Sequence, residues 1–154
     1  KSLKEGELFG IANGKAEFGP RALGNRSLCA DPRGPDVKDK MNVIKKRQKF
    51  RPFAPMILEE HFDDYFIGRK NRYMQFVSRA KHDYSSVTHV DGTARVQVVE
   101  KTNPSVSRLI LEEWYDKTGC PMLLNTSLNI KGQPIVNTWG DAMVFQSKYN
   151  VKVF

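Results

Sequence analysis

The chain has 154 residues, of which 40% are hydrophobic and 27% are charged, a composition typical of one folded domain that excludes an intrinsically disordered chain. A formal charge of +8, from 25 Lys and Arg against 17 Asp and Glu, favours anionic partners such as nucleic acid, nucleotide or phosphate. No run of about 18 apolar residues and no signal peptide occurs, so we expect a cytoplasmic protein without a membrane span.

The first half of the chain predicts two strands and one helix. Residues 8–13 form a short apolar run closed by Asn13 and Gly14, and residues 27–31 form a second run stopped by a proline. Residues 35–48 repeat apolar side chains at helical spacing, with a proline suited to the first turn. Residues 50–70 show no clear period, so we expect irregular structure there.

The second half predicts strands alternating with helices. Residues 73–80, 93–100 and 121–125 read as strands, and residues 151–154 as a closing strand. Two helices are expected, one capped by Asn103 and ending at Gly119, the other capped by Thr138 and covering residues 140–147. The apolar stripe of the first of these helices consists of Val106, Leu109, Ile110, Trp114 and Tyr115. Strands separated by helices indicate an α/β layered domain.

The cysteines and histidines argue against metal and nucleophile chemistry. Cys29 and Cys120 lack CxxC spacing, and we interpret them as small buried hydrophobic residues. None of the three histidines lies in an HxxxH or HxxE arrangement, and no GxSxG elbow occurs, so no metal site is predicted in this chain. The remaining polar inventory of Arg, Lys and small hydrogen-bonding groups suits the binding and polarisation of phosphates.

Two arginine-containing motifs could grip an anion. In FGPRALGNRS (residues 18–27), Arg21 and Arg26 lie on a glycine-punctuated loop, where a guanidinium can bind phosphate or carboxylate in a bidentate way. In THVDGTARVQ (residues 88–97), Arg95 follows an Asp-Gly turn. The alternatives are ordinary helix capping and surface ion pairs.

The motif KKRQKFRPFAP (residues 45–55) gathers further cations. Lys45, Lys46 and Arg51 approach a rigid Arg-Pro turn that the neighbouring Phe residues can anchor to the core. A solvated helix face is the alternative interpretation.

The stretch LLNTSLNIKGQPIV (residues 123–136) changes from an apolar strand to small polar residues. Asn125, Ser127 and Asn129 could either form a turn or line a ligand cradle.

Together these four motifs, in their order and spacing, resemble the C-terminal domain of O-carbamoyltransferases of the nodulation and antibiotic-tailoring type. The resemblance runs from about Leu8 to Ala142. It implies a YrdC-like fold, a twisted mixed sheet with flanking helices. The segment TSLNIKGQP, residues 126–134, is similar to a YrdC signature, which favours the cradle.

The resemblance also implies a function and a set of site residues. The domain would bind ATP, with Mg²⁺, and carbamoyl phosphate, and form carbamoyl adenylate. An N-terminal domain, expected to be missing from this piece of a longer enzyme and to hold iron or another metal, would transfer the carbamoyl group to a hydroxyl acceptor. The implied catalytic residues are Lys45, Arg51, Arg95 and Ser127, and the implied substrate-binding residues are Arg21, Arg26, Lys46, Asn125 and Asn129.

Departures from the usual residues of the family are expected at the rim of the site, at Gln48 or Lys49, Leu128 and Lys131. Two other functions stay open. A basic module could bind nucleic acid, with Tyr73 and Phe76 available for base stacking, or a degenerate domain could only scaffold its partner.

Overall fold

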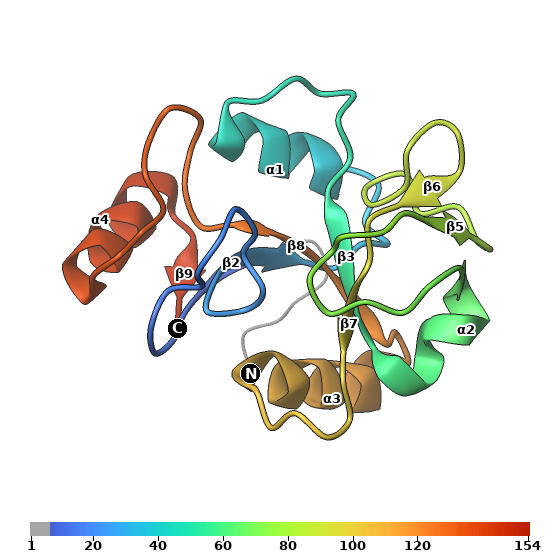
Figure 1. Cartoon of the computed structure of the whole chain (residues 1–154). Helices are drawn as coiled ribbons and strands as arrows, with labels where there is room; N and C mark the ends of the chain where they lie inside the picture. Colours follow the sequence, from blue (N-terminus) through green and yellow to red (C-terminus); the bar gives the residue numbers. More distant parts are fainter. Residues whose placement is uncertain (1–6) are drawn as a thin grey trace.

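A six-stranded mixed sheet with the order β7-β3-β8-β2-β1-β9 runs through the centre of the molecule (Figure 1). The computed structural model describes residues 7–154. The strands of this sheet are β1 (Leu8–Ala12), β2 (Arg26–Ala30), β3 (Ala54–Leu58), β7 (Gln97–Val99), β8 (Met122–Ser127) and β9 (Lys152–Val153). A smaller sheet contains β4 (Phe66–Ile67), β5 (Ser78–Ala80) and β6 (Thr93–Ala94).

The large sheet is mixed, with three antiparallel pairs in the middle and one parallel pair at each side. Strand β2 pairs antiparallel with β1 and β8, β8 pairs antiparallel with β3, and the two outer pairs, β3 with β7 and β1 with β9, are parallel. The helical elements are α1 (Val37–Lys45), a 3₁₀ turn η1 (Glu59–His61), α2 (Phe62–Tyr65), α3 (Val106–Thr118) and α4 (Trp139–Tyr149). The predicted α/β class, a mixed sheet with flanking helices, is therefore confirmed.

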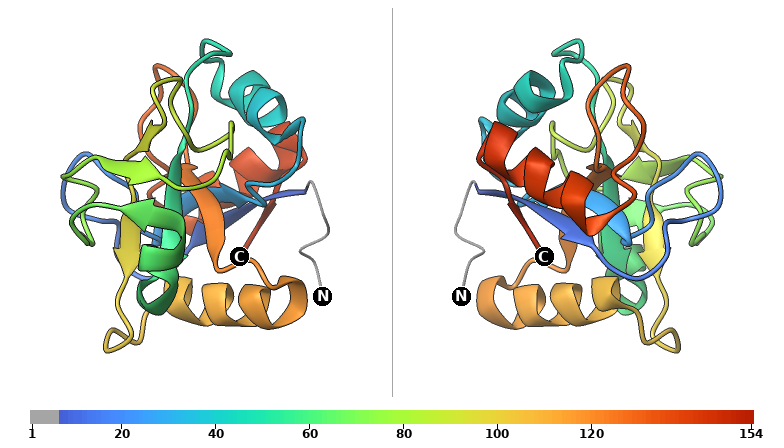
Figure 2. Two further views of the ribbon diagram at one scale, coloured as in Figure 1. Left: turned by 90° about the vertical axis from the view of Figure 1, so that its right-hand side faces the viewer. Right: turned by 90° about the vertical axis from the view of Figure 1, so that its left-hand side faces the viewer.

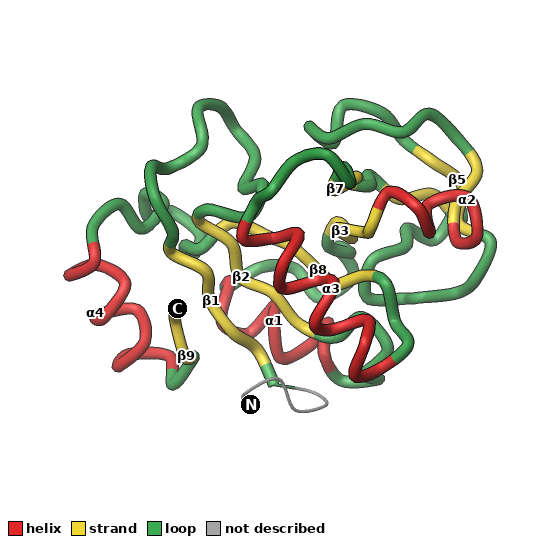
Figure 3. The backbone as a smooth tube through the Cα atoms, turned by 90° about the horizontal axis from the view of Figure 1, so that it is seen from below, coloured by secondary structure: helices red, strands yellow, loops and turns green. Residues whose placement is uncertain are grey.

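Helix α3 covers one face of the sheet, and α1 and α4 cover the other (Figure 2). From below, α3 lies across the strands (Figure 3). On the α3 side, Leu111 and Trp114 pack with Cys29 of β2, and on the opposite side Met41 of α1 and Phe145 of α4 belong to a second cluster. Alternate residues of β2 enter the two clusters, as expected for a strand buried on both faces.

Strand β3 lies where the sequence predicts irregular structure. Its residues Met56, Ile57 and Leu58 are all at most 1% exposed, and the strand is central in the sheet. Pro55 argues against a strand at this place in the sequence, because proline cannot donate a hydrogen bond to a neighbouring strand. In the structure Pro55 pairs with β8 but lies before the segment that pairs with β7, so the pairing with β7 needs no bond from it.

Two predicted strands are shorter than expected. Residues 73–77 are loop, with Met74 at a positive φ of 55°, and only β5 remains of that prediction. The strand predicted at residues 93–100 is interrupted at Arg95 and Val96, so that β6 and β7 belong to different sheets. The predictions for β1, β2, β8 and β9 are confirmed.

The helices differ from the predictions mainly at their ends. Helix α1 begins at Val37 and ends at Lys45, inside the expected range of 35–48. The N-cap of α3 is Ser105, whose side chain accepts a hydrogen bond from the Arg108 N–H, so the prediction of Asn103 is wrong. Within α3, Leu109 is 64% exposed and Leu111 takes its expected place in the core. The predicted cap Thr138 of α4 is confirmed, and it forms a capping box with Asp141.

Both cysteines are buried and unbridged, as predicted. Over residues 7–154, no helix is long and apolar enough to span a bilayer.

Candidate functional site

Three strand ends and one strand interruption bring the four motifs to the same edge of the sheet. Strand β8 ends at Ser127, which pairs with Ser27 near the start of β2, and Asn125 pairs with Ala54 at the start of β3. Strand β7 runs parallel to β3, so the residues before its start, Arg95 among them, reach this edge as well. Segments far apart in the sequence are thereby placed around one site.

Two adjoining pockets open at this edge. The small pocket, of about 150 Å³, is lined by Pro20, Arg21, Ala22, Arg47, Pro52, Phe53, Ala54, Met74, Arg95, Asn125, Thr126 and Ser127. The large pocket, of about 550 Å³, is lined by Arg21, Lys45, Arg47, Gln48, Arg51, Arg95, Asn129, Ile130 and Lys131. Three arginines, Arg21, Arg47 and Arg95, line both pockets.

The described residues that line the two pockets carry positive charge and include no carboxylate to balance it. Burial, together with the charges of Arg51 and Arg95, lowers the pKa of Arg47. Burial and the charges of Arg21 and Arg51 likewise lower the pKa of Arg95. Like charges held this close repel each other, so an anion in the pockets would relieve an electrostatic cost that the free chain carries.

Lys45 reaches the site from the last turn of α1. Its Nζ donates to the Ser127 carbonyl at 2.6 Å, to the Asn129 carbonyl and Oδ1 at 2.7 Å each, and lies 3.2 Å from Ser127 Oγ. Burial and the neighbouring Arg47 charge lower the pKa of this amine to about 7. The four oxygens are neutral, so the amine holds the Ser127–Asn129 turn in place without a counter-ion.

Asn125 is fixed by a chain of amide hydrogen bonds. Its Nδ2 donates to Gln97 Oε1 at 2.7 Å and to the Ala22 carbonyl at 3.0 Å, while Gln97 Nε2 donates to the Leu23 carbonyl at 2.8 Å. Two backbone carbonyls therefore determine the orientation of both side-chain amides. Among residues 7–154, the Asn125 Oδ1 finds no hydrogen-bond partner although it is buried, and the charged side chains of the adjoining pocket are all donors.

The turn after β8 is both a turn and a pocket wall. Ser127 Oγ donates to Asn129 Oδ1 at 2.6 Å, and Asn129 Nδ2 donates to the Gln133 carbonyl at 2.9 Å, which closes the turn. Ser127 lines the small pocket and Asn129 the large one. The turn and cradle interpretations are thus compatible, because the same side chains do both.

Seven of the nine side chains that the sequence predicts for the site lie at these pockets: Arg21, Lys45, Arg51, Arg95, Asn125, Ser127 and Asn129. The structure does not bring Arg26 and Lys46 there. All five N–H donors of Arg26 point to backbone carbonyls, those of Asn13, Gly14, Asn25, Val136 and Asn137, at 2.8–3.0 Å. Lys46 is exposed at the end of α1 in a left-handed conformation.

The sequence prediction overlooked Arg47, which lies between Lys45 and Arg51 in the chain and lines both pockets. Of the departures expected at the rim, Gln48 and Lys131 line the large pocket, Lys49 is exposed outside it, and Leu128 is fully buried in the core. The expectation of a rim position is therefore wrong for Leu128, whose side chain packs in the α1/α4 cluster.

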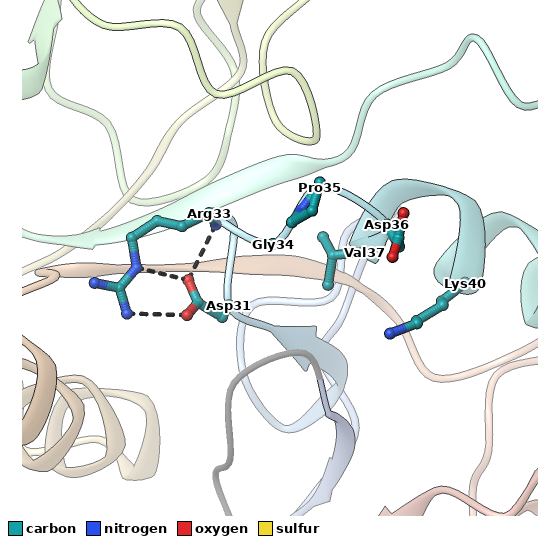
Figure 4. Close-up of a pocket in the computed structure, with 7 residues that line it drawn as sticks. All are labelled: Asp31, Arg33, Gly34, Pro35, Asp36, Val37 and Lys40. Carbon is teal, nitrogen blue, oxygen red and sulfur yellow. Dashed lines mark hydrogen bonds and ion pairs between the residues drawn. The ribbon is translucent and has the colours of Figure 1, made fainter.

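A separate pocket of about 380 Å³ lies at the opposite end of β2, and its charges are balanced (Figure 4). The Arg33 guanidinium donates to both carboxylate oxygens of Asp31 at 2.9 Å, and Lys40 and Asp36 complete the charged lining. Since each cation has a carboxylate in the same wall, this pocket lacks the unbalanced positive charge of the other two. Within residues 7–154, no three His, Cys, Asp or Glu residues are grouped so that they could hold a metal ion.

The family model described as carbamoyltransferase C-terminus matches residues 1–154, the full length of the chain. The chain belongs to this family. The family resemblance expected from the four motifs is therefore confirmed.

Among curated proteins, nodulation protein NolO of Bradyrhizobium diazoefficiens is 45% identical over 151 residues. The match covers 92% of the chain and 27% of NolO. The 3'-hydroxymethylcephem-O-carbamoyltransferase of Amycolatopsis lactamdurans is 38% identical over 148 residues, covering 94% of the chain and 28% of that protein. The chain therefore spans only about a quarter of the length of these relatives.

Among solved structures, full-length HypF in a phosphate- and nucleotide-bound form superposes with a TM-score of 0.72. The match covers 99% of this chain and 23% of the HypF chain, at 20% sequence identity. It shows that the two share a fold and supports the predicted YrdC-like sheet.

Proposed function

We propose that the two pockets bind ATP and carbamoyl phosphate and form carbamoyl adenylate. In the balanced reaction, carbamoyl phosphate, ATP and water give carbamoyl adenylate, pyrophosphate and inorganic phosphate. The large pocket would take the phosphates of ATP and the small pocket the carbamoyl phosphate. The observation that carries the proposal is a group of four arginines and one lysine around pockets in which no described lining residue is a carboxylate: Arg21, Lys45, Arg47, Arg51 and Arg95.

The chemistry of such a site requires no nucleophile of the protein. In reactions at phosphate, positioning of the reactants and neutralisation of developing charge supply most of the catalysis. Arg51 and Arg95 would bind phosphate oxygens, and the Lys45 amine would keep Ser127 and Asn129 in place beside them. The unpartnered Asn125 Oδ1 can accept a hydrogen bond only from a donor, which the carbamoyl NH₂ supplies and a phosphate oxygen does not.

Magnesium would enter with ATP. The lining residues offer Mg²⁺ no carboxylate, and this ion prefers oxygen ligands. The phosphate oxygens of ATP are such ligands, so we propose that the protein binds the Mg–ATP complex through the phosphates and that the ion neutralises part of their charge.

Transfer to an acceptor would be the task of a further region. The names of the relatives include an O-carbamoyltransferase, and about three quarters of the length of that relative lies outside the match. We propose that, in a longer protein, an N-terminal domain receives the adenylate, uses a metal bound by that domain, and passes the carbamoyl group to a hydroxyl. We also propose a cytoplasmic location, where ATP is available.

Calorimetric titration of Mg–ATP into the chain, and into an Arg95→Ala variant, tests the binding step. We expect the variant to bind about 10- to 100-fold more weakly at an unchanged melting temperature, since hydrogen bonds to charged groups contribute about 1.5–3 kcal/mol. A single-stranded RNA oligonucleotide serves as the comparison ligand. RNA binding that weakens steeply with salt, with no binding of ATP, would refute the proposal in favour of a nucleic-acid-binding module.

A further inference from the structure

A buried amide side chain begins strand β7. Gln97 is 4% exposed, and its neighbours Val96 and Val98 are buried as well. Burial of an amide among apolar side chains costs free energy unless its polar atoms are hydrogen-bonded. Both polar atoms of Gln97 have partners, since Oε1 accepts from Asn125 Nδ2 at 2.7 Å and Nε2 donates to the Leu23 carbonyl at 2.8 Å. Gln97 is not among the described residues that line the two pockets, so any effect on a ligand passes through another residue.

The register of the sheet places Gln97 and Asn125 on one face. Asn125 of β8 pairs with Ala54 of β3. Gln97 of β7 pairs with Met56, two residues further along β3. Residues two apart in a strand point to the same face, and residues paired across strands share that face. The face is that of α3, because Met56 and Cys29, which pairs with Asn125 from β2, belong to the core cluster on the α3 side.

The loop that receives these hydrogen bonds is itself fixed. The Leu23 and Asn25 N–H groups donate to Glu17 Oε1 at 2.8 and 2.6 Å. Ser107 of α3 also donates to the Leu23 carbonyl, at 3.4 Å. The Ala22 and Leu23 carbonyls therefore have fixed positions, against which the two side-chain amides are oriented.

Only one orientation of the Asn125 amide fits this arrangement. Gln97 presents Nε2 to the Leu23 carbonyl, so it presents Oε1 to Asn125. Asn125 Nδ2 then has two acceptors, Gln97 Oε1 and the Ala22 carbonyl. The reversed amide would bring three acceptor oxygens together without a donor between them. Asn125 Oδ1, which has no partner among the described residues and belongs to a residue of the small-pocket wall, is thereby the group left for a ligand.

We propose that Gln97 is the positioning residue that makes the small pocket selective for a ligand with an NH₂ group, because it leaves Asn125 Oδ1 and not Nδ2 for that ligand. This inference rests on the proposed function, in which the small pocket takes carbamoyl phosphate. Acetyl phosphate carries the same phosphate and has a methyl group where carbamoyl phosphate has NH₂. The methyl group cannot donate a hydrogen bond, so the acetyl compound leaves Oδ1 unpaired and binds more weakly.

Calorimetric titration of carbamoyl phosphate and of acetyl phosphate tests this assignment through the ratio of the two dissociation constants. We expect the unmodified chain to bind carbamoyl phosphate about 10-fold more tightly. Gln97→Met removes one acceptor of Asn125 Nδ2, so the two orientations of the amide become closer in free energy, and the preference should fall to about threefold or less. A general loss of packing would weaken the binding of both ligands alike and leave the ratio unchanged.

Two further variants separate the positioning role from other roles of Gln97. Gln97→Glu keeps an oxygen acceptor for Asn125 Nδ2 whether or not the carboxyl group is protonated, so the preference should remain even where the added charge changes both affinities. Ser107→Ala removes a second donor to the Leu23 carbonyl and leaves both acceptors of Asn125 in place, so it should keep the preference as well. Gln97→Val, which also removes both polar groups and suits a strand, replaces Gln97→Met if circular dichroism shows that variant unfolded.

The outcomes distinguish this inference from the function on which it rests. A preference that survives in the folded Met or Val variant, or that is lost equally in Gln97→Glu or Ser107→Ala, would overturn the positioning role. Equal affinities of the unmodified chain for the two ligands would overturn the selectivity and leave the binding of carbamoyl phosphate standing. Failure of the unmodified chain to bind either ligand would overturn both the inference and the assignment of the small pocket to carbamoyl phosphate.

Discussion

Replacing Arg26 by methionine should lower the stability of the fold strongly and leave the affinity of the site for its ligands nearly unchanged. The side chain is 7% exposed, and its five donors join the loop before β2 to the segment before α4. Methionine keeps much of the buried volume and removes every donor. The bond from Nε to the Val136 carbonyl is buried, whereas the acceptors on Asn13, Gly14 and Asn137 belong to exposed residues that water can reach.

The size of the effect follows from these partners. A hydrogen bond from a charged donor contributes about 1.5–3 kcal/mol, and rehydration of the exposed carbonyls reduces the sum, so we expect a loss of about 3 kcal/mol. An unfolding entropy of about 2.1 cal/mol/K per residue amounts to about 0.32 kcal/mol/K for this chain, which converts the loss into a fall of about 9 °C in melting temperature.

Scanning calorimetry of the variant measures this fall, and Arg21→Met is the matched control. Arg21 lies in the same loop, is exposed and makes no hydrogen bond with the described residues, so its replacement should change the stability by less than about 0.5 kcal/mol while weakening ligand binding. A fall of less than about 3 °C for Arg26→Met, together with lost affinity for ATP, would contradict the structural role and make Arg26 a ligand residue.

Three further substitutions test other parts of the account. Lys46→Gly should raise the stability by about 0.5–1 kcal/mol in urea denaturation, because glycine adopts a positive φ without strain, and should leave ATP affinity unchanged; a loss of affinity would place Lys46 in the site. Lys45 keeps its proton up to an ordinary pKa of 10.5 when unfolded but only to about 7 when folded, so stability should rise with pH between these values by up to about 1.4 kcal/mol per pH unit; equal slopes for the native chain and Lys45→Met at pH 7.5–9.5 would contradict the lowered pKa. Gly24→Ala should lower the stability by about 2 kcal/mol or more in a thermal melt, since φ is +118° and the new Cβ would collide with Ser107 Oγ; a loss below about 0.5 kcal/mol would refute that clash.

The sequence predicts strands and helices well where the local pattern and the tertiary environment agree. Thr138 has both the cap side chain and the acidic partner three residues later, and the cap forms as predicted. Strand β3 was hidden because Pro55 is a strand breaker in general, and only the register shows that its missing N–H is not needed on the β7 side. Such a register depends on contacts with residues about 40 positions away in β7 and about 70 positions away in β8, which no local pattern contains.

The motifs predict the place of the site better than they predict which of its residues contact a ligand. The sequence predicts that β8 passes into a polar stretch and that Asn125 and Ser127 belong to the site. The structure places both side chains at the small pocket. The run of Lys45, Lys46 and Arg47 looks uniform in the sequence, and the end of α1 decides which of the three side chains faces the pockets and which faces solvent. The sequence does not show that Arg26 has a structural role and Arg21 a place at the pockets. The carbonyl partners of Arg26 come from two segments that meet only in the fold.

Exchange of labelled pyrophosphate into ATP, dependent on carbamoyl phosphate, tests the central claim most directly. Carbamoyl adenylate re-forms ATP only by reacting with pyrophosphate, so labelled pyrophosphate enters ATP when the adenylate forms. We therefore expect exchange with the unmodified chain and its loss in Arg95→Ala at an unchanged melting temperature. Absence of exchange in a chain that binds both ATP and carbamoyl phosphate, or exchange that persists in Arg95→Ala, would contradict adenylate formation at this site.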